Sequence, residues 1–179
     1  MITNQYVIEL PNLHYDKSKL KSICDSATNW NNRVVGVDGR STTYQILGGT
    51  DVTQNEYVIE LIAKFSPVLN INPNIEKLIG ILRMPPDGGL DAHLDVKRQA
   101  VVIFPIQPED PAPIYYAEGT YQNPTKILFE HQYTCATIIN AQILHGIRND
   151  SRMRDTLQFS LMTPWEDLLT LNQEGKILV

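Results

Sequence analysis

Short apolar segments separated by turns rich in proline and glycine run through the second half of this 179-residue chain. The segments span residues 78–82, 100–106, 114–116, 126–129, 136–144 and 156–162. They are too short for ordinary helices and are rich in β-branched and aromatic residues, which is typical of strands. A row of short strands with such turns between them predicts a β-sandwich or β-barrel.

The first half of the chain carries helical patterns instead. Residues 16–27 place apolar side chains at helical spacing after Asp16, a candidate N-cap. Residues 51–68 form a stronger amphipathic pattern, in which Thr53 and Glu56 are spaced as a capping box. A short helix is expected around residues 166–171. We therefore expect a mainly β fold with the N-terminal helices packed against one sheet.

The composition limits the classes of protein to which the chain can belong. At 42% hydrophobic and 20% charged residues, residues 1–179 are expected to form a single folded domain. A net charge of -5 argues against a nucleic-acid-binding protein, which would need a basic face. No signal peptide or membrane-spanning run is evident, so we expect a cytoplasmic protein with Cys24 and Cys135 reduced.

Two potential metal ligands follow the glycine-rich turn near residue 88. In an extended segment, His93 and Asp95 project to the same side and Leu94 to the other. An imidazole and a carboxylate on one side supply two of the three ligands in a two-histidine, one-carboxylate iron site. His145, at the end of a later apolar segment, is the best candidate for the third ligand. The remaining histidines, His14 and His131, are expected in solvent-exposed positions.

The last predicted strand alternates polar and apolar residues. Its polar set would share one face, so Arg154 and Thr156 would point inward together, next to the strand that leads to His145. A guanidinium can bind a carboxylate through two hydrogen bonds, and a hydroxyl two residues away can donate to the same group. An inward arginine is costly unless it meets an anion, which indicates a dicarboxylic cosubstrate.

Other residues compete for the anion-binding role. Arg152 lies on the same predicted face as Arg154 but nearer a turn, so we favour Arg154. Arg98 is a second-line candidate that we expect mainly at the surface. Asn140 and Tyr115 are candidates for the contact to the other end of the cosubstrate.

The order His93-x-Asp95, His145, Arg154-x-Thr156 resembles the 2-oxoglutarate/Fe(II)-dependent oxygenase superfamily, in particular its prolyl and aspartyl/asparaginyl hydroxylase-like branches. His145 follows Asp95 by 50 positions, and Arg154 follows His145 by nine. The resemblance covers roughly residues 77–162. It implies a double-stranded β-helix, which is a distorted, cupin-like jelly roll, with helices on its major sheet.

The resemblance also implies an activity. Fe(II) would be held by His93, Asp95 and His145, and 2-oxoglutarate by Arg154 and Thr156. With dioxygen, such an enzyme hydroxylates a C–H bond and releases succinate and carbon dioxide. The expected substrate is a small molecule or a peptide, with a peptidyl or free amino acid as the first choice.

Two alternatives remain open at this point. One is a cupin-type metal enzyme that does not use 2-oxoglutarate, although such proteins usually carry more histidines and a glutamate ligand. The other is a non-catalytic jelly roll with a binding or structural role.

Overall fold

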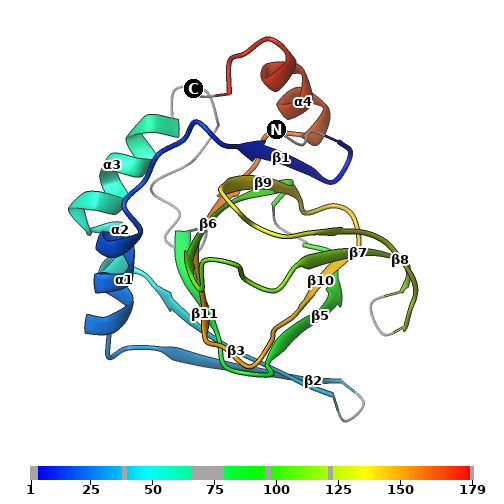
Figure 1. The fold of residues 1–179 in the computed structure, drawn as a ribbon, viewed down its shortest axis with the longest axis horizontal. Helices are drawn as coiled ribbons and strands as arrows, with labels where there is room; N and C mark the ends of the chain where they lie inside the picture. The colour runs from blue at the N-terminus through cyan, green and yellow to red at the C-terminus, as the bar shows by residue number, and fades with distance from the viewer. Residues whose placement is uncertain (1–3, 38–39, 66–78, 96–97, 121–122, 178–179) are drawn as a thin grey trace.

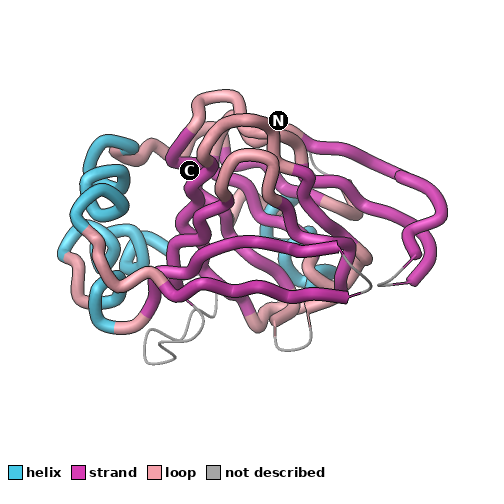
Figure 2. The backbone as a smooth tube through the Cα atoms, turned by 90° about the horizontal axis from the view of Figure 1, so that it is seen from below, coloured by secondary structure: helices cyan, strands magenta, loops and turns pink. Residues whose placement is uncertain are grey.

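The computed structural model of the chain describes residues 4–37, 40–65, 79–95, 98–120 and 123–177 (Figure 1). Most of this part is antiparallel β-structure, and most of the helical segments lie to one side of it (Figure 2). The strands are β1 (Val7–Leu10), β2 (Asn31–Val37), β3 (Arg40–Gly48), β4 (Ile79–Met84), β5 (Gly89–His93), β6 (Ala100–Gln107), β7 (Ile114–Thr120), β8 (Asn123–His131), β9 (Ala136–Asn140), β10 (His145–Arg148) and β11 (Arg154–Leu161). The helices are α1 (Lys17–Ser26), α2 (Thr50–Thr53), α3 (Glu56–Phe65) and α4 (Trp165–Gln173).

The strands form two sheets that face each other around a common interior. The major sheet has the order β1-β9-β6-β11-β4-β3-β2, and the minor sheet has the order β5-β10-β7-β8. Strands β4 to β11 alone give two four-stranded sheets, between which the chain crosses repeatedly. This is the eight-stranded arrangement of a jelly roll. The predicted double-stranded β-helix is therefore confirmed, and β1, β2 and β3 widen its major sheet.

Each face of the major sheet buries a different set of apolar residues. The outer face packs against the helices, as the sequence predicted, and Figure 1 shows α1, α2 and α3 along this face. The inner face packs against the minor sheet. The outer cluster includes Leu20, Leu61, Phe104, Leu157, Phe159 and Trp165, and the inner cluster includes Met84, Val101, Ile103, Ile114, Tyr116 and Ile147. Alternation along the strands, interrupted by register shifts such as the one between His145 and Ile147 of β10, therefore decides which residues can reach the interior.

The helical predictions were correct in position but wrong in two details. Asp16 caps α1, because its carboxylate accepts hydrogen bonds from the backbone of the first turn. The predicted helix over 51–68 is split into α2 and α3, and its last residues lie outside the described part. Asn55 rather than Thr53 caps α3, because the Asn55 side chain accepts from the backbone N–H of Tyr57 at 3.0 Å. The Thr53 hydroxyl instead donates back to the carbonyl of Gly49 at 2.9 Å.

The three strands that precede β4, namely β1, β2 and β3, were not predicted from the sequence. Strands β2 and β3 pair as a hairpin, and β3 also pairs with β4 in the major sheet. Few apolar residues alternate along this hairpin, so its sequence carries little strand signal. Among the described residues, no helix combines the length and apolar character needed to cross a bilayer.

His131 is buried, contrary to the expectation of a solvent-exposed histidine. It retains 4% exposure and stacks against Phe129 at the end of β8. Its Nε2 atom has no hydrogen-bond partner among the described residues, and the nearest carboxylate oxygen, from Glu9, lies 3.9 Å away. Burial lowers the pKa of His131, so its neutral form is the one that the fold accommodates.

We expect His131 to make the protein sensitive to acid. As the pH falls below about 6.5, the unfolded chain takes up a proton at this histidine before the folded chain does. The free energy of unfolding should therefore keep its full value above that pH and should decrease as the pH falls below it. His131→Gln should show a smaller decrease between pH 7 and pH 5 in urea unfolding. His14→Gln, which changes an exposed histidine, should keep the wild-type dependence. Equal pH dependence in all three proteins would contradict the assignment.

Candidate metal centre

Strands β5 and β10 bring two histidines together at the edge of the interior. His93 ends β5 and His145 begins β10, and the antiparallel register pairs these two residues directly. Their ring centroids lie 4.5 Å apart. The two imidazoles are thus placed by backbone hydrogen bonds of the minor sheet, which is a rigid way to hold a pair of ligands.

Both imidazoles are oriented in the same way by their own chain. Nδ1 of His93 lies 2.8 Å from the carbonyl oxygen of Asp91, and Nδ1 of His145 lies 2.8 Å from that of Ile143. A carbonyl oxygen only accepts hydrogen bonds, so each Nδ1 must carry the proton and donate it. The lone pair of each neutral ring is then on Nε2, and this tautomer is the one that a metal ion requires.

Asp95 lies just beyond the end of β5, in a loop fixed by the turn between β9 and β10. Its backbone N–H donates to the carbonyl of Ala141 at 3.1 Å. The Gln142 side-chain amide donates to the carbonyls of Asp95 at 2.9 Å and Arg98 at 2.6 Å. The same turn leads into His145, so it links the carboxylate to the second histidine.

The three donor groups converge as the sequence predicted. One ligand atom from each of His93, Asp95 and His145 lies within 4.8 Å of the other two. The Asp95 oxygens lie 3.7 Å from His93 Nε2 and 3.8 Å from His145 Nε2. Metal bonds of about 2.1 Å at right angles place neighbouring donors about 3 Å apart, so these donors would move closer by up to about 2 Å to close on an ion. The donor set fits a mononuclear two-histidine, one-carboxylate site.

The environment of His145 favours a neutral ligand. Burial and the neighbouring His93 ring lower the pKa of His145 to about 4. Protons therefore do not compete for this imidazole near neutral pH, because its Nε2 stays deprotonated well below pH 7.

A glycine after His145 allows the minor sheet to close around the site. A Cβ atom at Gly146 would lie 2.5 Å from the Tyr115 hydroxyl and 2.8 Å from the carbonyl oxygen of Leu90. Any other residue at this position would force apart Tyr115 and the two paired strands that carry the histidines. The requirement is thus a close approach rather than an unusual backbone angle.

The triad opens into a cavity of about 350 Å³ between the two sheets. Its wall combines polar residues near the triad with apolar side chains from both sheets, and strand β3 contributes to it. The cavity is lined by Tyr44, Ile46, Leu82, Leu90, Asp91, His93, Leu94, Asp95, Arg98, Ile103, Ile114, Ile139, His145, Ile147 and Gln158. An apolar chamber with a few converging polar groups is the usual form of a small-molecule site.

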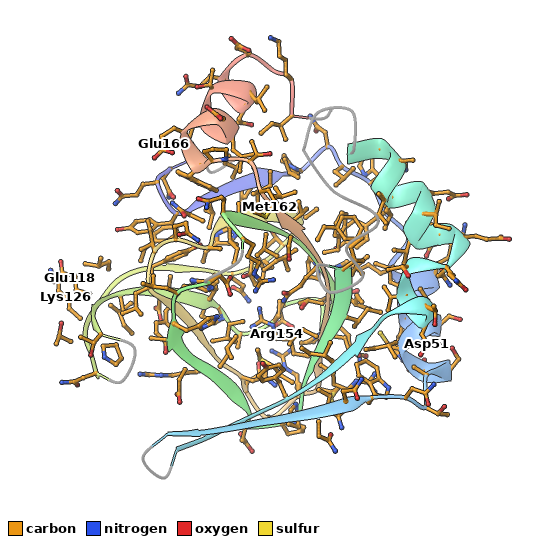
Figure 3. All side chains as sticks on the ribbon, turned by 180° about the vertical axis from the view of Figure 1, so that it is seen from behind. Asp51, Glu118, Lys126, Arg154, Met162 and Glu166 are labelled. Atoms are coloured by element: carbon orange, nitrogen blue, oxygen red, sulfur yellow. The ribbon has the colours of Figure 1, made fainter. Side chains whose placement is uncertain are left out.

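Arg154 and Thr156 both lie on the inner face of β11, which also carries Gln158. Arg154 is 1% exposed and lies between the two sheets (Figure 3). Its Nη1 donates to the carbonyl of Ala112 at 2.6 Å, whereas its Nε and Nη2 have no hydrogen-bond partner among the described residues. A buried guanidinium with unpaired donors is a strong anion-binding group, because it has lost its water without a replacement.

Tyr133 adds a second polar group beside this guanidinium, and it was not identified from the sequence. The Arg154 guanidinium carbon lies 5.1 Å from the centre of the Tyr133 ring. The Tyr133 hydroxyl is also buried without a hydrogen-bond partner among the described residues. Tyr133 lies between β8 and β9, where no motif or strand pattern marks it, so only the fold reveals its proximity to Arg154.

The structure also places the other candidates. Arg152 is at the surface, where it forms ion pairs with Asp110 and Asp150. The Asn140 amide bonds to backbone groups at Gln5 and Gln142. Tyr115 packs in a separate cluster with Ala92, Ala117 and Leu144, apart from the cluster between the two sheets. Neither Asn140 nor Tyr115 is therefore available for the cosubstrate contact.

Arg98 differs most from expectation. It was expected mainly at the surface, but its side chain is only 24% exposed and forms part of the cavity wall. Its guanidinium pairs with both oxygens of Asp95.

Comparison with known proteins identifies the fold. No family model and no curated protein matches the sequence. Three solved structures resemble the chain. A prolyl-4-hydroxylase from Pseudomonas putida has a TM-score of 0.58 at 14% identity, over 88% of this chain and 92% of that one. The Escherichia coli ribosomal oxygenase YcfD, solved with cobalt and succinic acid, has a TM-score of 0.59 at 13% identity, over 94% of this chain and 53% of that one.

The third is a 2OG-Fe(II) oxygenase family oxidoreductase from Burkholderia pseudomallei. It has a TM-score of 0.56 at 10% identity, over 81% of this chain and 78% of that one. The present chain spans about half the length of YcfD but most of the length of the other two. The fold is thus that of 2OG-Fe(II) oxygenases, as the sequence resemblance implied.

The triad predicts a single divalent-ion site. We expect the wild-type protein to bind one Mn²⁺ ion per chain, measured by electron paramagnetic resonance titration. Asp95→Ala should weaken this affinity on the order of 100-fold or more, because it removes the only anionic member of the triad. Asp110→Ala removes an exposed carboxylate elsewhere and should leave the affinity unchanged. Equal affinity in wild type and Asp95→Ala would refute the site.

Proposed function

We propose that this protein is a 2-oxoglutarate-dependent non-haem iron dioxygenase that hydroxylates a C–H bond of its substrate. The observation that carries the proposal is the pairing of a two-histidine, one-carboxylate triad with a buried, incompletely bonded arginine in one interior. Either feature alone is compatible with a different role, whereas the two together match an ion and a dicarboxylate.

The residues of β11 support this arrangement through their spacing. Gln158 lines the cavity near the triad, and Arg154 is two inward-facing positions further along the same strand. Gln158 and Arg154 are thus about 13 Å apart along the extended strand. The long arginine side chain can span part of this distance towards the ion. A five-carbon dicarboxylate could therefore contact the ion with one end and Arg154 with the other.

Different groups of residues in the chain would bind the ion and the cosubstrate. When bound, Fe(II), 2-oxoglutarate and dioxygen supply the oxidising chemistry, which yields succinate, carbon dioxide and the hydroxylated product. His93, Asp95 and His145 would hold the ion at the edge of the cavity. Arg154, Thr156 and the Tyr133 hydroxyl bind and orient the far carboxylate. The apolar walls from both sheets exclude water around the reacting groups.

The buried guanidinium distinguishes this function from the two alternatives. A cupin-type enzyme that does not use 2-oxoglutarate would have no need for a carboxylate-binding arginine deep in the interior. A purely structural jelly roll would be more stable with an apolar residue there, because unpaired buried donors destabilise the fold. The arginine therefore argues for a bound anion.

For the substrate, we propose a peptidyl or free amino acid side chain. The cavity wall includes Tyr44 and Ile46 of β3 and the exposed Leu94, which offer apolar contacts in the same cavity as the triad. A screen for succinate release against peptides and free amino acids would identify it. Release driven by another metabolite class and by neither of these would contradict this part of the proposal.

We expect Arg154→Met to separate stability from cosubstrate binding. Methionine approximates the length of the arginine side chain and needs no hydrogen bonds, so the melting temperature without 2-oxoglutarate should be equal to or above that of wild type. Saturating 2-oxoglutarate with Mn²⁺ should raise the melting temperature of wild type but not of Arg154→Met. The apparent affinity for 2-oxoglutarate should fall on the order of 10- to 100-fold, as loss of charge-assisted hydrogen bonds implies.

Arg152→Met is the matched control, since it removes a guanidinium from the same segment but at the surface. Its response to 2-oxoglutarate should equal that of wild type. Unchanged Mn²⁺ affinity in Arg154→Met would show that the triad is intact. If 2-oxoglutarate stabilised Arg154→Met as much as wild type, the assignment of this arginine would be wrong.

A further inference from the structure

Arg98 makes a two-point contact with the only carboxylate of the triad. Its Nε donates to one oxygen of Asp95 at 2.7 Å, and its Nη2 donates to the other at 3.2 Å. Both side chains are largely buried, at 24% and 14% exposure. A fork-like pair in such surroundings is stronger than a surface ion pair, because less water screens it.

Further contacts keep the guanidinium at the site. Its Nη1 lies 3.3 Å from the Ser160 hydroxyl and 3.5 Å from the Gln158 side-chain oxygen, both on the inner face of β11. The backbone carbonyl of Arg98 is held by Gln142, which also holds Asp95. Arg98 is therefore a fixed part of the cavity wall.

An ion and Arg98 can share Asp95. A carboxylate has about four lone-pair positions, and the arginine fork uses one on each oxygen. The same two oxygens lie 3.7 and 3.8 Å from the histidine Nε2 atoms, so lone pairs remain on the side of the triad. An ion at the triad would then lie about 5 Å from the guanidinium, given a metal–oxygen bond of about 2.1 Å.

The formal charges of the residues in and near the cavity sum to zero before any ligand binds. The described charged residues that line the cavity are Asp91, Asp95 and Arg98, and Arg154 lies further along the inner face of β11. At neutral pH these two acids and two bases sum to zero. A lone divalent ion adds two positive charges, and the dianion of 2-oxoglutarate restores neutrality.

We propose that Arg98 couples the binding of the metal ion to the binding of the dianionic cosubstrate. Its positive charge opposes a divalent ion that binds alone and favours the ion together with the dianion. This inference rests on the proposed function and adds to it a residue that acts through the triad and the charge of the cavity.

The competing effect is a purely positional role, in which Arg98 preorganises Asp95 for the ion. Fixing one short side chain recovers about 1 kcal/mol at most, or roughly fivefold in affinity. Repulsion between a guanidinium and a dication at about 5 Å amounts to roughly tenfold even with the dielectric constant of water, and more in a protein interior. The electrostatic effect should therefore dominate.

The test measures Mn²⁺ affinity with and without saturating 2-oxoglutarate, in wild type and three variants, by paramagnetic resonance titration. Mn²⁺ reports binding without turnover. Arg98→Gln should bind Mn²⁺ alone about tenfold more tightly than wild type. The factor by which 2-oxoglutarate raises the Mn²⁺ affinity should be smaller in Arg98→Gln than in wild type, by about fivefold or more. Arg98→Lys keeps the charge but not the fork, so it should behave like wild type. Arg152→Gln makes the same charge change at the surface and should also behave like wild type.

The outcomes separate this inference from the proposed function. Arg98→Gln with wild-type affinity and enhancement, or with weaker binding of Mn²⁺ alone, would overturn the coupling role and leave the proposed function intact. Arg98→Lys that resembles Arg98→Gln would overturn the role of charge. A wild-type protein that binds no Mn²⁺, or whose Mn²⁺ affinity does not respond to 2-oxoglutarate, would overturn the proposed function and the inference together.

Discussion

The antiparallel register of β5 and β10 is the constraint on which the site depends. It pairs His93 with His145, and a shift of one residue would turn one imidazole to the opposite face of the minor sheet. The apolar residues between the two sheets hold this register, because the same shift would turn Leu90 or Ile147 out of the interior. The packing of the interior and the geometry of the triad are thus a single requirement.

Strand β11 carries two neighbouring buried charges that differ in their hydrogen bonding. Asp155 faces the helices and is fully paired, with two hydrogen bonds from Arg83 and one from Gln107. Arg154, one residue earlier, faces the interior and keeps two nitrogen atoms unpaired among the described residues. A satisfied network stabilises the fold, whereas unpaired donors destabilise it until an anion arrives. Asp155 therefore has a structural role, whereas Arg154 carries the proposed contact to an anion.

Sequence alone was sufficient for the parts governed by local pattern. Alternation identified the inner face of β11, and the spacing of two identified His93 and Asp95 although Asp95 lies beyond the end of its strand. It was insufficient where long-range contacts decide. His131 and Arg98 sit in polar stretches that predict exposure, yet the fold buries His131 and leaves Arg98 only partly exposed. Tyr133 becomes significant only because β8 and β9 bring it to Arg154.

The two kinds of ligand are held in ways that suit different tasks. The histidines are set by strand pairing and by carbonyls of their own chain, so their positions follow from the sheet. Asp95 lies outside the strands, and side chains of Gln142 and Arg98 hold it instead. Substitutions in those side chains can adjust the carboxylate without disturbing the sheet. The fold is shared with other proteins at 10 to 14% identity. Within such a fold, substitutions outside the strands can change the charge around the candidate ion site while the strands keep their positions.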